Sequence, residues 1–174
     1  MQIKTFRSFH EEHKKLYEDI LNLTYSINDT YPQHSTWFKE KFLPDLKNKK
    51  RIYIVAQDEN GKLAGCILLK NTEEEKKICT LFVHPDYRKQ GVGRKLVEQT
   101  LLELGEHPLI TVSDRNIAQL MPLLKKKGFH LSAVKKGVYR PEDTEYYFND
   151  QRADIIKNGL IPVLIHRMNQ MNQR

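Results

Sequence analysis

The order of apolar and polar residues predicts alternating strands and helices. One stretch is the most informative. Residues 78–83 are apolar or β-favouring on both alternating faces, which is typical of a strand that is covered on both sides. Pro85 ends this strand because proline has no backbone N–H for a β-ladder. Residues 93–104 then have apolar positions at helical spacing, and Gly105 is suited to the helix end.

The first half of the chain predicts one strand, two helices and a pair of strands. In chain order these elements are a strand at 2–8, helices at about 10–28 and 35–48, and strands at 51–57 and 63–69. Ser8, with Glu11 three residues later, suggests a capping box at the first helix. Pro44 predicts a kink or an early end in the second helix. Asn60-Gly61 predicts a tight turn between the two paired strands.

The second half predicts a strand at 109–112, a helix between Asn116 and Gly128, and a strand at 129–139. Pro122 inside that helix predicts a bend or a later start. Two alternatives remain for the last strand. It is either 145–148 followed by a tail, or 160–168 with 140–158 as a crossover excursion. We prefer 160–168, because it holds the most β-prone run that remains.

The bulk composition narrows the class of protein. A chain of 174 residues suits one domain, so we expect a single domain over 1–174. No apolar run approaches the roughly 20 residues of a membrane span, and the polar N-terminus does not fit a signal peptide. We therefore expect a cytoplasmic protein without a membrane partner. Cys66 and Cys79 both fall in predicted strands and fit core positions, and the scattered histidines predict no metal site.

The formal net charge of +7 fits either an acidic cofactor or a nucleic acid. Because no recognised nucleic-acid motif accompanies the charge, nucleic-acid binding is the weaker alternative. The lysines at 125–127 could reach a cofactor phosphate, but such runs are usually solvated faces.

Residues 88–95 (RKQGVGRK), between the central strand and its helix, have the chemistry of an anion site. The first amides of a helix lack intrahelical partners and lie at the positive end of its dipole. Gly91 and Gly93 have no Cβ, so a phosphate can approach the backbone, and four cations flank them. Neither the dinucleotide fingerprint nor the P-loop string fits this stretch. The pattern predicts a diphosphate as the ligand.

The string Arg88-x-x-Gly91-x-Gly93, after a strand ending in VHPDY, resembles the acetyl-CoA signature of the GNAT superfamily of N-acetyltransferases. Asn116-Ile117-Ala118 and Gly128-Phe129 resemble a second segment of that family. The resemblance covers 78–129 and implies an α/β fold, with a splayed central mixed β-sheet of six to seven strands flanked by about four helices. It assigns 1–50 to the acceptor side, 78–129 to the acetyl-CoA-binding core, and 140–174 to a late strand, a crossover or a C-terminal extension.

The resemblance also implies an activity: direct attack of a primary amine on acetyl-CoA in a ternary complex, without a metal. The implied cofactor-binding residues are Phe82, Val83, Arg88, Lys89, Gln90, Gly91, Val92, Gly93, Arg94 and Asn116. Backbone groups of Phe82 and Val83 would stabilise the oxyanion. The acceptor would be a small-molecule or protein amine, with Tyr25, Tyr31, His34 and Trp37 as candidate contacts. A homodimer through the C-terminal segment is left open.

The general acid and base are not identified by the resemblance. Many family members have a tyrosine four residues before the helix-ending glycine, and here that residue is Leu124. Tyr139, Tyr146 and Tyr147 are alternative acids, with Tyr139 and Tyr147 preferred. Glu75 is the candidate base from the acidic turn before the central strand. Leu124 also keeps open a second class, a non-catalytic module that binds acyl-CoA.

Overall fold

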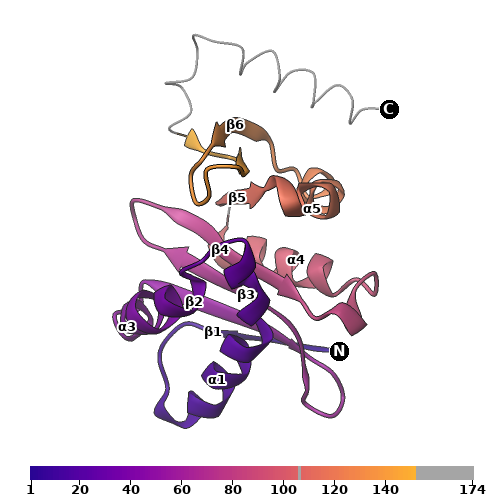
Figure 1. Ribbon diagram of the computed structural model, residues 1–174. Helices are drawn as coiled ribbons and strands as arrows, with labels where there is room; N and C mark the ends of the chain where they lie inside the picture. Colours follow the sequence, from indigo (N-terminus) through magenta and orange to yellow (C-terminus); the bar gives the residue numbers. More distant parts are fainter. Residues whose placement is uncertain (106, 152–174) are drawn as a thin grey trace. The chain divides into compact units, whose positions relative to one another are not determined.

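The computed structural model describes residues 1–105 and 107–151 (Figure 1). The chain divides into two compact units, Met1–Pro108 and Leu109–Arg174. The acetyl-CoA core expected at 78–129 has its strand and first helix in unit 1 and its second helix in unit 2. The single domain over 1–174 stays a prediction.

Unit 1 contains an antiparallel sheet in the order β1-β2-β3-β4. Its strands are β1 (Gln2–Phe6), β2 (Arg51–Gln57), β3 (Leu63–Asn71) and β4 (Lys76–Val83). All four strands expected in this part of the sequence are therefore confirmed. In β4, Thr80 pairs with Leu68 and Ile78 pairs with Leu69, so Cys79 is an extra residue that forms a β-bulge.

The turn between β2 and β3 is longer than Asn60-Gly61 predicts. Gly61 has a left-handed backbone with φ of 80°, and Asn60 is not among the residues with positive φ. Asp58 organises the turn, because its Oδ1 accepts the backbone N–H groups of Asn60 and Lys62, both at 2.9 Å. A side chain, as well as the glycine, thus sets this connection.

The helical segments of unit 1 are short and change type along the chain. They are η1 (Glu11–His13), α1 (Lys14–Leu23), η2 (Tyr25–Asp29), α2 (His34–Trp37), the π-helical η3 (Phe38–Phe42), α3 (Leu43–Lys47), η4 (Pro85–Tyr87) and α4 (Val92–Leu104). The early end considered at Pro44 is wrong, because α3 continues through this proline to Lys47. The turn before it, Phe38–Phe42, is π-helical, and proline has no N–H to donate to that turn. The capping box is wrong, because helical backbone begins only at Glu11, and the Ser8 hydroxyl instead contacts His10 Nε2 at 3.0 Å.

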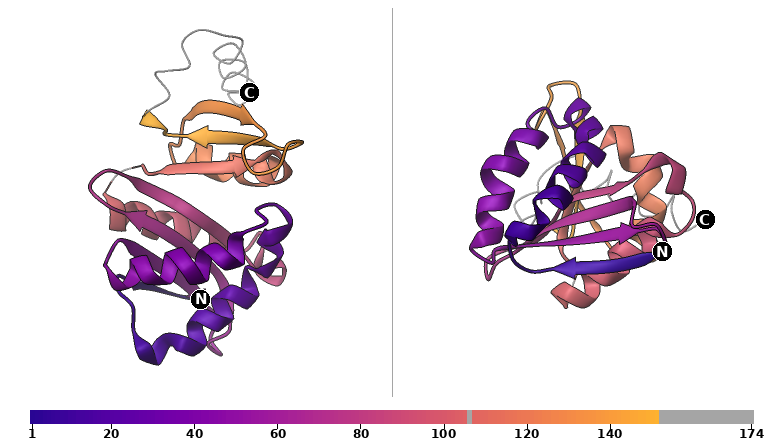
Figure 2. Two further views of the ribbon diagram at one scale, coloured as in Figure 1. Left: turned by 60° about the vertical axis from the view of Figure 1, so that its left-hand side comes forward. Right: turned by 90° about the horizontal axis from the view of Figure 1, so that it is seen from below.

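Helices cover both faces of the unit 1 sheet (Figure 2). On one face, α1, α2, η3 and α3 bury a core that includes Tyr17, Ile20, Phe38, Phe42, Leu46, Tyr53, Val55, Cys66 and Leu68. On the other face, Gly65 of β3 lies against Val92 and Leu96 of α4. Successive residues of a strand point to opposite faces, so Gly65 and Cys66 serve the two layers in turn.

Unit 2 contains β5 (Leu109–Ser113), α5 (Asp114–Lys126), β6 (Leu131–Lys136) and β7 (Thr144–Phe148). The strand β7 is antiparallel to β5 and to β6 and lies between them. The crossover excursion expected over 140–158 is therefore wrong at 144–148, where backbone pairing on both edges holds the chain as a strand. The alternative strand at 160–168 lies outside the described residues.

The helix α5 begins earlier than its sequence suggests. Ser113 is its N-cap, and the Ser113 hydroxyl accepts the backbone N–H of Arg115 at 3.3 Å. Pro122 lies inside the helix, so the later start expected from this proline is wrong. Asn116 is consequently in the first turn of α5.

Seven strands in the described residues agree with the six to seven expected, and the helical stretches 14–23, 34–47, 92–104 and 114–126 agree with about four helices. No helix in residues 1–105 and 107–151 is both long enough and apolar enough to cross a membrane.

Candidate functional site: the β4–α4 junction

The end of β4 directs backbone groups to two sides. The N–H of His84 donates to Ala64 O at 2.9 Å, so this pair is hydrogen-bonded across β3 and β4. Hydrogen-bonded and non-hydrogen-bonded pairs alternate along an antiparallel ladder. The backbone N–H and C=O of Phe82 therefore point toward β3, whereas those of Val83 point away from it. Consistent with this, Val83 O accepts Arg88 Nε at 3.1 Å.

The connection from β4 to α4 is a compact turn closed by its own bonds. The N–H of Asp86 donates to His84 Nδ1 at 3.3 Å, and Arg88 N donates to Pro85 O at 3.2 Å. Gln90 Nε2 donates to Asp86 O at 2.7 Å. Two residues in the left-handed region complete the reversal, namely Lys89 with φ of 60° and Gly91 with φ of 79°.

The backbone from Lys89 to Arg94 presents a row of unused donors. Gly91 is the N-cap of the 13-residue helix α4, and the N–H of Lys95 is the first to bond back, to Gly91 O at 3.0 Å. None of the six N–H groups at 89–94 donates to an acceptor in the described residues. These donors lie at the positive end of the α4 dipole, where an anion is stabilised. The geometry is that of a phosphate site.

Cations surround the same backbone. Arg88, Lys89, Arg94 and Lys95 are exposed. A Cβ on Gly91 would lie 3.7 Å from Arg94 Nη2, so this guanidinium lies beside the glycine. The guanidinium of Arg88 is 5.9 Å from the ring centre of Phe82. The junction thus combines backbone donors with exposed positive charge, which is the combination expected for a diphosphate.

Two supports of the junction were missed by sequence reasoning. A Cβ on Gly65 would lie 2.8 Å from Phe82 O and 3.2 Å from Leu96 Cδ1, so only glycine lets β3 approach both β4 and α4 this closely. A glycine inside a strand was the available signal. The second support is a bond from Tyr87 Oη to Asp58 Oδ2 at 2.7 Å, which joins residues far apart in sequence and left no local signal.

The structure does not bring Glu75 to the junction. Glu75 lies in the turn between β3 and β4, where its Oε2 accepts Lys70 Nζ at 2.8 Å. Its backbone N–H donates to Thr72 Oγ1 at 3.1 Å. Val83 is at the other end of the strand, and eight steps of about 3.3 Å put the two residues roughly 26 Å apart. In this conformation Glu75 stabilises a turn.

In unit 2, the remaining candidates have different environments. Asn116 is half-buried on α5. Tyr147 is buried on β7 beside Leu109, and Lys135 Nζ lies 4.4 Å from the centre of its ring. Tyr139 is 47% exposed in the connection between β6 and β7. Leu124, at the position of the usual tyrosine, is completely buried.

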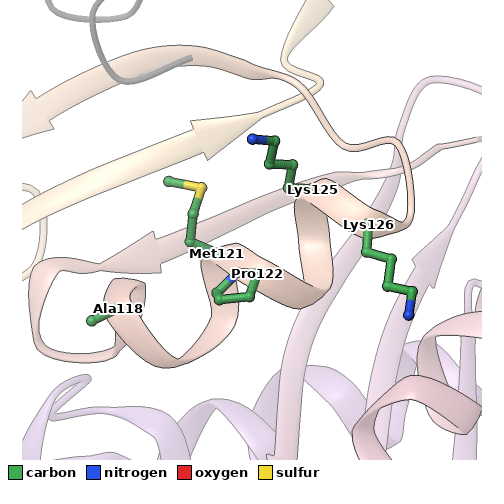
Figure 3. A pocket seen from close by; sticks show the side chains of 5 residues that line it. All are labelled: Ala118, Met121, Pro122, Lys125 and Lys126. Atoms are coloured by element: carbon green, nitrogen blue, oxygen red, sulfur yellow. The ribbon is translucent and has the colours of Figure 1, made fainter. Parts of the chain in front are cut away.

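An open depression of about 650 Å³ lies on α5 (Figure 3). Its lining residues are Ala118, Met121, Pro122, Lys125 and Lys126. Figure 3 shows the ammonium groups of Lys125 and Lys126 extending away from each other, so they do not form one anion-binding cluster. In residues 1–105 and 107–151, no three His, Cys, Asp or Glu side chains gather as a metal site requires.

On the expected acceptor side, Tyr25 is 69% exposed, whereas His34 is buried. His34 Nε2 lies 3.0 Å from Thr24 Oγ1, and the Thr24 hydroxyl donates its only proton to Ile20 O at 2.9 Å. His34 Nε2 therefore carries the hydrogen of that pair. Burial lowers the pKa of His34 to about 4, so its imidazole is neutral at physiological pH. This histidine links the C-terminal end of α1 to α2.

Comparison with known proteins shows a similarity to acetyltransferases. A family model described as an acetyltransferase (GNAT) domain matches residues 49–131, which include β2 to α4 and the junction. The [ribosomal protein bS18]-alanine N-acetyltransferase of Escherichia coli (strain K12) is 29% identical over 89 residues, covering 49% of this chain and 60% of that protein. The peptidyl-lysine N-acetyltransferase YjaB of Salmonella typhimurium (strain LT2) is 29% identical over 135 residues, covering 76% of this chain and 86% of that protein.

The solved structures agree on the fold. An aminoglycoside 6'-N-acetyltransferase complexed with coenzyme A has a TM-score of 0.64 and 16% identity, covering 85% of this chain and 95% of that one. The α/β fold class expected from the resemblance is thereby confirmed. The chain is therefore similar to the GNAT acetyltransferases, over residues 49–131 by the family model and in its fold by the solved structure. It spans about 60% of the length of the alanine acetyltransferases that it matches.

Proposed function

We propose that the protein is an acetyl-CoA-dependent N-acetyltransferase that acts on a primary amine. The observation that supports this most directly is the row of six backbone N–H groups at 89–94, at the start of α4 and among four cations, that donate to no acceptor within 1–105 and 107–151. A diphosphate can accept several of these hydrogen bonds at once, and the helix dipole favours its charge. The names of the relatives from Escherichia coli and Salmonella typhimurium indicate the same reaction class.

The end of β4 would hold the thioester. The N–H of Val83 points away from β3, so it can donate to the acetyl carbonyl oxygen, while the N–H of Phe82 points toward β3. A donor fixed in a strand needs no reorganisation when negative charge develops on that oxygen. Of the two backbone groups expected in this role, Val83 is therefore the better oxyanion donor.

The reaction proceeds by direct attack. The neutral amine attacks the acetyl carbonyl carbon and forms the N–C bond, and the nitrogen then releases one proton to water. The C–S bond breaks, and the coenzyme leaves as a thiolate that takes up a proton. Tyr139 and Tyr147 are the proposed proton donors, with water as the alternative. Because Glu75 lies far along β4, we assign it no catalytic role in this conformation. Orientation and desolvation of the amine supply the remaining acceleration.

The proposed acceptor class is an amine, either on a small molecule or on a protein. The names of similar proteins include a ribosomal-protein alanine, a peptidyl lysine and an aminoglycoside as acceptors, and all three carry amines. We keep the cytoplasm as the proposed location.

Calorimetry with coenzyme A and acetyl-CoA tests the cofactor site. Gly91→Glu puts a carboxylate where the diphosphate is proposed to bind, and like charges at this range cost several kcal/mol. We expect the dissociation constant to rise at least about 100-fold. Gly105→Glu is the matched control, because Gly105 has a similar left-handed φ of 71°, caps the other end of α4 and has open space around it. Equal binding by the two variants, or no binding by the wild type, would contradict the proposal.

A second candidate function is a non-catalytic module that binds acyl-CoA, and the buried Leu124 in place of the usual tyrosine favours it. A thiol-release assay with acetyl-CoA and a panel of amines, peptide N-termini and lysine peptides separates the two. The enzyme releases coenzyme A in step with acetylated product. Tight binding with no release above the uncatalysed rate for any amine would favour the module.

A further inference from the structure

The turn of the β2–β3 hairpin is bonded directly to the turn that precedes α4. Tyr87 Oη donates to Asp58 Oδ2 at 2.7 Å. The other oxygen of this carboxylate, Oδ1, already accepts the N–H groups of Asn60 and Lys62. The N–H of Asp58 donates to Lys62 O at 3.0 Å, and Lys62 Nζ lies 5.9 Å from the centre of the Tyr87 ring. Bonds within the hairpin turn therefore hold the Asp58 carboxylate in place, independently of its bond to the tyrosine hydroxyl.

The segment 84–91 has little else to hold it. Its other hydrogen bonds join its own residues to one another, to the adjacent end of β4, to Ala64 through the N–H of His84, or to the first turn of α4. In the described residues, Tyr87–Asp58 is its only side-chain hydrogen bond to a distant part of the chain. Lys89 moreover has a left-handed backbone that a non-glycine residue rarely adopts.

A strained turn keeps its shape only when its surroundings hold it there. The six unpaired N–H groups begin two residues after Tyr87, and their directions depend on where this turn lies. An anion site built from backbone donors loses affinity when those donors must be ordered during binding. A charge-assisted hydrogen bond, such as that from Tyr87 to Asp58, is strong enough to influence how well these backbone donors are ordered before the ligand binds.

We propose that the Tyr87–Asp58 hydrogen bond holds the 89–94 backbone in the conformation that binds a diphosphate, so that Tyr87 and Asp58 are positioning residues for the coenzyme. The inference rests on the proposed function and adds two residues to it. Neither side chain needs to touch the ligand. The effect is on the affinity for coenzyme A, and the rate constant of the chemical step at saturation is unchanged.

Tyr87→Phe is the sharpest test, because it removes one hydroxyl and keeps the ring. We expect the dissociation constant for coenzyme A and the KM for acetyl-CoA to rise about three- to tenfold, with kcat within about twofold of the wild type. Glu103→Gln is the control. Glu103 accepts two bonds from Arg7, at 2.9 and 2.7 Å, at the other end of α4, so the substitution removes the charge and one acceptor from a long-range contact of this helix. We expect it to leave the dissociation constant and KM unchanged.

A double-mutant cycle of Asp58 and Tyr87 also tests whether loss of the Asp58 carboxylate weakens or strengthens coenzyme A binding. Loss of the Asp58 carboxylate would by charge alone favour an anionic ligand. We instead expect Asp58→Ala to weaken coenzyme A binding in the wild type, and to cause no further weakening in the Tyr87→Phe background. Tighter binding by Asp58→Ala, or additive losses in the double variant, would overturn the proposal.

Backbone relaxation by nuclear magnetic resonance on the ligand-free protein separates this inference from the proposed function. Tyr87→Phe should lower the order parameters at 89–91, and Glu103→Gln should not. Unchanged order parameters and unchanged coenzyme affinity in Tyr87→Phe would overturn the inference while the enzyme assignment stands. A wild type that binds no coenzyme would overturn the proposed function, and the positioning role for the coenzyme with it.

Discussion

The buried histidine of the α1–α2 region makes stability sensitive to pH in a calculable way. His34 is 6% exposed and donates from Nε2 to Thr24, whose own proton is given to Ile20 O. Burial lowers the pKa of His34 from its usual value of 6.5 to about 4. The folded protein therefore resists protonation of an imidazole that the unfolded chain protonates readily.

The sign and the size of this pH effect on the free energy of unfolding follow from the difference between the folded and unfolded pKa values of His34. Because the folded-state pKa is lower than the unfolded one, the unfolded state gains a proton first as the pH falls through about 6.5. This contribution to stability is fully present above about pH 6.5 and is lost progressively down to about pH 4. With these two pKa values, the contribution of His34 to the free energy of unfolding falls by about 2 kcal/mol between about pH 7 and about pH 5, and by about 3 kcal/mol in all.

Urea unfolding at several pH values, followed by fluorescence of the single tryptophan, Trp37, measures this loss. The comparison is with His34→Gln, since a glutamine amide can still donate to Thr24 and does not titrate. Other histidines and carboxylates contribute equally to both proteins, so the difference between them isolates His34. We expect the stability difference, wild type minus variant, to shrink by about 2 kcal/mol between about pH 7 and about pH 5.

A difference that stays constant across this range would refute the reasoning, because it would mean that His34 takes up a proton equally in the folded and unfolded states. A difference that grows on acidification would require the opposite sign, with a partner that stabilises the imidazolium. In the described residues, the only side-chain hydrogen bond of the ring is to the Thr24 hydroxyl.

Three further predictions concern the sheet and the chemistry. Gly65→Ala should lower the free energy of unfolding by about 1–3 kcal/mol and weaken acetyl-CoA binding, because its Cβ would meet a β4 carbonyl oxygen at 2.8 Å; denaturation and calorimetry check both. Arg51→Met should destabilise by about 3 kcal/mol in denaturant unfolding, because it leaves Asp45 Oδ2, now bonded at 2.9 Å, without its buried partner. Either Tyr139→Phe or Tyr147→Phe should lower kcat about 100-fold if that hydroxyl protonates the thiolate, and unchanged kcat in both would assign the proton to water.

The sequence alone was sufficient to predict the strand, the turn and the helix that make up the β4–α4 junction. Its features are contiguous: a strand that ends at Val83, glycines at 91 and 93, and a helix that stops at Gly105. The backbone rules that govern them act between near neighbours, since helix amides lack partners and glycine accepts a left-handed backbone. The first four strands and the position of α4 were predictable for the same reason.

Tertiary structure decided the features that depend on distant partners. Residues 144–148 became the strand β7 because both of its edges pair, with β5 and with β6, and no local pattern distinguished them from the β-prone run further on. In the sequence, Tyr87 is only one residue of the stretch VHPDY, and its hydrogen bond to Asp58 appears only in the folded structure. Glu75 lies near Val83 in the sequence, yet the extended strand β4 separates the two residues in space. Local propensity fixes the type of each element, whereas register and side-chain contacts across the sheet are set only when residues remote in sequence pack together.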